Sequence, residues 1–167
     1  MPFRRPVPHN VNMSETKELL RSDLTTSMKA KDQVRTATLR MVLTAVSAEE
    51  VAGKSAKELS DEEVVAVLSR ERKRRLEAAE AFESGDRPEQ AAQELAEAEI
   101  IAGYLPQPLS SSELEALIVT AVTNAETLGL SGGRAMGAVM KELKPATAGR
   151  VDGGELAALV KRALGMG

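Results

Sequence analysis

The side chains of this chain that could act on another molecule are mostly cations near one short turn, Gly-Arg-x-Asp-Gly. The basic residues around that turn are Arg134, Lys141, Lys144 and Arg150. Gly149 and Gly153 permit a positive φ or the close approach of another backbone, and Asp152 can cap a following helix. Two interpretations stay open. The turn either docks one helix on another, or it presents amides and cations that grip a phosphodiester backbone.

A second cationic cluster places five basic residues within six positions, at Arg70, Arg72, Lys73, Arg74 and Arg75. Such a run can neutralise phosphates, and Arg72 and Lys73 are kept as candidate RNA contacts. The favoured interpretation is a solvated helix face, because Glu71 with Arg75 and Lys73 with Glu77 stand four residues apart and can pair. No aromatic residue is interleaved to stack on a base. A looser group, Lys29, Lys31, Arg35 and Arg40, also favours a solvated or helix-stabilising role.

The sequence contains few residues in arrangements that could catalyse a reaction. The chain has no cysteine and one histidine, His9, in its proline-rich beginning. It has no Ser/His/Asp spacing, and its glutamate runs lack the Glu-x-x-His pattern of a di-iron bundle. We therefore expect no catalytic residue, no cofactor and no metal site.

Composition indicates an all-α protein. Hydrophobic residues make up 43% of the 167 positions but aromatic residues only 2%, so the core must consist of Leu, Val, Ala, Met and Ile, which suit closely packed helices. The net charge of −3 means that nucleic-acid binding would need a local basic patch. No apolar run reaches the roughly 20 residues that span a bilayer, and no signal-peptide pattern is present. We expect a cytoplasmic protein without membrane contact.

Capping residues and prolines divide the chain into helices. Ser60 with Glu63, and Ser110 with Glu113, are capping boxes, and Pro88 suits the first turn of a helix. Pro106 and Pro108 mark the best domain boundary. We expect a disordered tail at 1–12, an N-terminal helical array at 13–105, and a small C-terminal three-helix bundle at 106–167. The bundle's later helices are expected at about 134–143 and 154–164.

Apolar spacing predicts which helix faces are buried. In the first helix, from about Lys17 to Lys31, the core stripe is predicted to be Leu20, Leu24 and Met28. In the second helix, which Asp32 can cap, the predicted stripe is Val34, Ala37, Met41 and Ala45 or Val46.

Several short motifs, in a fixed order after Met13, resemble the GatB/YqeY family and specifically its free-standing YqeY-like proteins. They are Asp23-Leu24-x-x-x-Met28-Lys29-x-Lys31-Asp32, Leu39-Arg40-Met41, Arg70-Glu71-x-Lys73-x-Arg75, Tyr104-Leu105-Pro106-x-Pro108-Leu109-Ser110, Met136-Gly137-x-Val139-Met140-Lys141, Gly149-Arg150-x-Asp152-Gly153 and Leu159-Val160-Lys161. Pro108 departs from the family pattern, which has Gln there.

The resemblance implies a relation to the helical C-terminal tail of the B subunit of glutamine-dependent tRNA amidotransferases, which looks like a tRNA-gripping appendage. The kinase and transamidation site of those enzymes lies in a separate cradle domain, which this chain lacks. The leading hypothesis is thus an accessory module without its own catalytic site that binds tRNA or another structured RNA. The contacts would be Arg134, Lys141, Lys144 and Arg150, with Gly149, Asp152 and Gly153 shaping the turn.

Two alternatives stay open. The chain could be an interaction module that docks on an amidotransferase or an aminoacyl-tRNA synthetase, which the negative net charge favours. It could also be a component with carbon–nitrogen ligase activity that uses glutamine as amido-N-donor, which the missing nucleophile disfavours.

Overall fold

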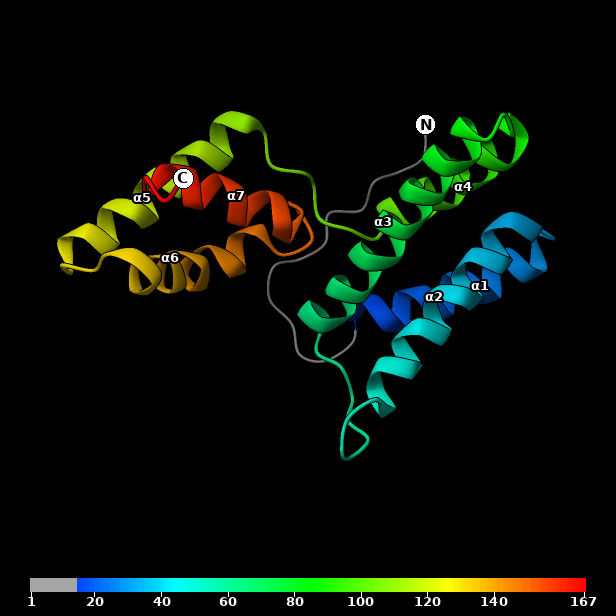
Figure 1. Cartoon of the computed structure of the whole chain (residues 1–167). Helices are drawn as coiled ribbons and strands as arrows, with labels where there is room; N and C mark the ends of the chain where they lie inside the picture. The colour runs from blue at the N-terminus through cyan, green and yellow to red at the C-terminus, as the bar shows by residue number, and fades with distance from the viewer. Residues whose placement is uncertain (1–14) are drawn as a thin grey trace. The chain divides into compact units, whose positions relative to one another are not determined.

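The computed structural model describes residues 15–167, and in this range every regular element is an α-helix (Figure 1). The expected all-α class is confirmed. The expectations for residues 1–12, including His9, lie outside the described residues. The helices are α1 (Glu15–Lys29), α2 (Gln33–Val51), α3 (Asp61–Ser84), α4 (Pro88–Ala102), α5 (Ser111–Thr127), α6 (Gly132–Thr147) and α7 (Gly153–Ala163).

The helices begin where local capping chemistry predicts. At α3 the Ser60 hydroxyl accepts the Glu63 amide, and the Glu63 carboxylate accepts the Ser60 amide in return. Ser110 and Glu113 make the same reciprocal pair at α5. Each pair satisfies two donors that the first turn of a helix leaves without partners. Both predicted capping boxes are confirmed, as is Pro88 at the start of α4.

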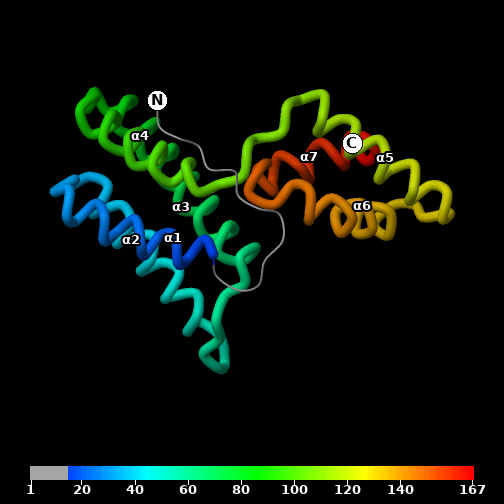
Figure 2. Tube along the Cα trace, turned by 180° about the vertical axis from the view of Figure 1, so that it is seen from behind, coloured from blue at the N-terminus to red at the C-terminus, as the bar shows by residue number. Residues whose placement is uncertain are grey.

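The chain divides into two compact units between Pro106 and Gln107. The first unit contains α1 to α4, in which α3 and α4 form a long antiparallel hairpin and α1 packs against α2 (Figures 1 and 2). The second unit contains α5 to α7, and each of its three helices packs against the other two. Each unit has an apolar core of its own.

The core of the first unit uses a different face of α2 from the one the sequence predicts. Its buried members on α2 are Leu39, Val42 and Val46, which pack with Leu20 of α1 and Leu68 of α3. The predicted stripe of Val34, Ala37 and Met41 is exposed, so that prediction is wrong except for its last position. Met28 of α1, also predicted as core, is 50% exposed. Helix α2 is apolar on two faces, and spacing alone does not distinguish them.

On α5, the core of the second unit contains the buried side chains of Leu114, Ile118 and Val122. Helix α6 is longer than predicted, because its last turn continues past Pro145 to Thr147. Met136 and Met140 are partly buried and pack against this core. No helix among residues 15–167 has the length and apolarity needed to cross a membrane.

Candidate functional site

The turn between α6 and α7 is built as the Gly-Arg-x-Asp-Gly pattern predicts, with one exception. Gly149 adopts a φ of 70°, a conformation that favours glycine. Asp152 caps α7, and its Oδ1 accepts the amides of Gly154 and Glu155 at 3.0 Å each. Gly153 has no positive φ, and a side chain there would meet nothing within 4 Å. Only Gly149 therefore needs the conformational freedom of glycine.

Arg150 is used by the architecture of the turn. Its Nε donates to the Gln107 carbonyl oxygen at 2.7 Å, and its Nη1 reaches the Ala146 carbonyl at 3.5 Å. Because Gln107 is the first residue of the second unit, this arginine holds the start of the unit against the turn. A guanidinium with its donors on backbone carbonyls has fewer left for a phosphate.

Three other predicted cations share the solvent face of α6. Arg134, Lys141 and Lys144 are exposed, and helical geometry places them on one stripe because they stand seven and three residues apart. The opposite side of α6 is buried through Ala135, Val139 and Leu143. We call Arg134, Lys141 and Lys144 the α6 cationic face.

Little negative charge lies near the α6 cationic face on its own helix. The single acid of α6 is Glu142, which accepts a hydrogen bond from Asn124 Nδ2 at 2.7 Å. Among residues 15–167, none of the three cations of the face forms an ion pair. Residues 107–167 carry six basic and six acidic side chains. The positive potential of this unit is therefore local to the α6 cationic face. A local basic patch of this kind is what nucleic-acid binding requires in a chain whose net charge is negative.

The cationic run on α3 has a different character, because carboxylates neutralise much of it. Arg70 pairs with Glu49 of α2 at 2.7 Å, and Arg75 pairs with Glu97 of α4 at 2.9 Å. Glu71 pairs with Arg74 at 2.8 Å, so the predicted pairing of Glu71 with Arg75 is wrong.

The two candidate RNA contacts on α3 differ in exposure. Arg72 is half-buried, and its buried Nε has no hydrogen-bond partner among the described residues. Lys73 is exposed. Three of the five cations in this run are held by acids, which supports the interpretation of a solvated, ion-paired face.

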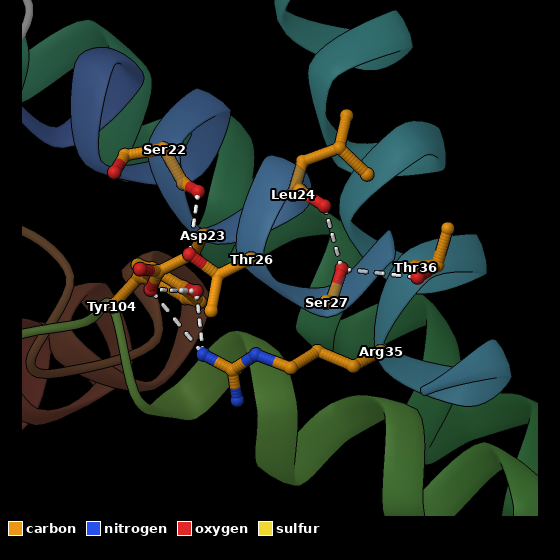
Figure 3. A network of polar contacts seen from close by, with 8 residues as sticks. All are labelled: Ser22, Asp23, Leu24, Thr26, Ser27, Arg35, Thr36 and Tyr104. Atoms are coloured by element: carbon orange, nitrogen blue, oxygen red, sulfur yellow. Dashed lines mark hydrogen bonds and ion pairs between the residues drawn. The ribbon is translucent and has the colours of Figure 1, made fainter. Parts of the chain in front are cut away.

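The first unit contains a polar network that the sequence patterns did not predict (Figure 3). The Tyr104 hydroxyl donates to Asp23 Oδ2 at 2.6 Å, and Arg35 Nη2 donates to the Tyr104 oxygen at 2.8 Å. Arg35 also pairs with Asp23 at 3.3 Å. These residues come from α1, α2 and the segment just after α4, so the network fastens the last residues of the unit to its first two helices. The one signal in the sequence was that Tyr104 is the only tyrosine of the chain.

Burial raises the pKa of Tyr104 well above its ordinary value of 10.0, and the hydrogen bond to Asp23 raises it further. Because the pKa is higher in the folded state, the phenol's contribution to stability is complete below pH 10.0 and is lost as the pH rises toward the folded-state pKa. We expect tyrosinate absorbance to appear only above pH 10.0 and together with loss of helical circular dichroism. A titration centred at 10.0 in protein that stays helical would contradict this. Tyr104→Phe is the control, since it removes the titrating group.

No group of three or more acidic or histidine side chains among residues 15–167 is arranged to hold a metal ion.

Nearly the whole chain matches one known protein family. Residues 17–164 match the family model described as Yqey-like protein. A comparison with curated proteins found no match.

Proposed function

Because this chain belongs to the YqeY-like protein family, we propose that it is an RNA-binding accessory protein that holds tRNA or another structured RNA against the α6 cationic face. The observation that carries the proposal is that the cations of α6 gather on one side of the helix, apart from acidic groups. Three cations line the solvent side of this helix without an acidic partner among the described residues. Phosphates are the anions that a row of Lys and Arg at helical spacing fits, because each neutralised phosphate releases counterions.

The mode of recognition would be shape and phosphate, with little reading of bases. Residues 107–167 contain no Phe, Tyr or Trp, so the second unit offers no platform on which a splayed base can stack. Arg150 and Asp152 would act indirectly, by holding the turn at the end of α6. This chain would have no catalytic step of its own. Release of ammonia from glutamine by the purified protein would instead favour the carbon–nitrogen ligase alternative.

The salt dependence of tRNA binding tests the proposal. We expect labelled total tRNA to bind the full chain at about 50 mM salt and to bind roughly 40-fold more weakly at about 200 mM, if three phosphates are neutralised. Fluorescence anisotropy measures both affinities. Absence of binding at both concentrations would refute the proposal, and binding that does not change with salt would refute the phosphate contacts.

A second candidate function is docking on an amidotransferase or an aminoacyl-tRNA synthetase. The net charge of −3 favours it, because the molecule as a whole repels a polyanion. Association with such an enzyme that survives RNase treatment would support this candidate over RNA binding.

A further inference from the structure

Helix α2 presents a second apolar face to solvent. Val34 is 45% exposed and Met41 is 47% exposed, and Ala37 lies between them on the same stripe. The opposite face of the helix fills the core through Leu39, Val42 and Val46. A helix that is apolar on a second, uncovered side is a common mark of an interaction surface. We call Val34, Ala37 and Met41 the outer face of α2.

Flexible side chains border this outer face. Arg40 Nη2 lies 3.7 Å from the sulfur of Met28, which is itself 50% exposed on α1. On the other flank, Arg75 Nη2 lies 3.5 Å from the sulfur of Met41. Methionine side chains adapt to irregular partners, and exposed methionines are frequent on surfaces that bind peptide helices. The surface therefore joins an apolar centre to methionines on two helices.

Cations outnumber acids around the outer face, although the exposed Asp32 caps α2 two residues before Val34. The two acids of α2, Glu49 and Glu50, pair with Arg70 and Lys17. Within residues 15–167, the neighbouring cations Lys29, Lys31 and Arg40 form no ion pair. A ligand that covers the apolar stripe would thus meet positive charge at its edge, and acidic groups on the ligand would complement it.

We propose that the outer face of α2 binds an amphipathic helix of another protein, one that carries apolar anchors on one side and acidic residues beside them. Val34 and Met41 stand seven residues apart, or roughly 10 Å along the helix axis, with Ala37 between them. That length matches two turns of a partner helix whose anchors recur at three, four and seven residues.

Two other occupants fit less well. If two copies met through this face about a two-fold axis near Met41, Arg40 would approach Arg40 of the other copy without an acid on either outer face. RNA would find an apolar centre in place of a row of cations, and the face contains no aromatic residue for stacking. An acidic amphipathic helix would both cover the apolar stripe and place carboxylates beside the cations at its edge.

The first experiment is selection from a displayed library of helical peptides on the full chain. Counter-selection uses the double variant V34E/M41E, whose substitutions lie at exposed positions. We expect enriched peptides to share apolar spacing of three, four and seven residues with Asp or Glu beside it, and to bind the variant about tenfold or more weakly. The matched control is V119E/L128E, which places two glutamates at exposed apolar positions of the second unit and should leave binding unchanged.

Methyl NMR locates the binding surface. Addition of an enriched peptide should shift the Met28 and Met41 methyl signals and leave Met136 and Met140 unchanged. The proposal is overturned if no peptide is enriched over the V34E/M41E counter-selection, or if the enriched peptides are basic. It is also overturned if RNA shifts Met28 and Met41, or if the free chain forms a dimer that V34E/M41E abolishes.

Discussion

Replacing Leu39 by Ala should lower the free energy of unfolding of the first unit by about 2–5 kcal/mol. Leu39 is 1% exposed and packs with Leu20 and Leu68 in the core between α1, α2 and α3. The substitution removes apolar packing and leaves a cavity, and the surrounding helices close it only in part. Urea unfolding followed by circular dichroism measures the decrease, and a second transition from the other unit would be fitted separately.

Met41→Ala is the matched comparison for Leu39→Ala, because both residues lie on α2 and both substitutions shorten a large apolar side chain. Met41 is 47% exposed, so its replacement should change the free energy of unfolding by less than about 0.5 kcal/mol. A larger decrease at Met41 would mean that the stripe predicted from the sequence is the buried one, and equal decreases would mean that both faces of α2 are packed.

Removing the three charges of the α6 cationic face should weaken tRNA binding by about tenfold or more at about 50 mM salt. The triple variant is R134A/K141A/K144A, whose changes lie on the solvent side of α6 and leave its core side intact. The dependence of log affinity on log salt should also become shallower by roughly 0.9 for each phosphate that the variant no longer neutralises. Anisotropy titrations at several salt concentrations give both quantities.

A charge-matched control separates a local site from a general electrostatic effect. K29A/K31A/R40A removes three positive charges from the first unit, and it should leave tRNA affinity and salt slope near those of the unchanged protein. If the two triple variants weaken binding equally, RNA contacts the chain without preference for α6. If only the first-unit variant weakens it, the α6 face is the wrong site.

Local patterns in the sequence were sufficient for the helices and the turns. The Ser60–Glu63 and Ser110–Glu113 pairs stand three residues apart, and the Asp152 cap acts on amides two and three residues ahead. Such interactions form within one helical turn, so residue types at a fixed spacing identify them. The all-helical class can also be predicted from the sequence, because helix formation depends on residues close together in the chain.

The sequence by itself determined where helices begin, which family pattern the chain carries and where cations are concentrated. Tertiary structure alone decided how those cations and apolar stripes are used. Arg70 and Arg150 find partners 21 and 43 residues away, at Glu49 and Gln107. Helix α2 offers two apolar stripes, and only packing against α1 and α3 selects Leu39 over Met41 for the core. Burial depends on neighbours brought together by folding, and their positions are not encoded in the periodicity of one helix.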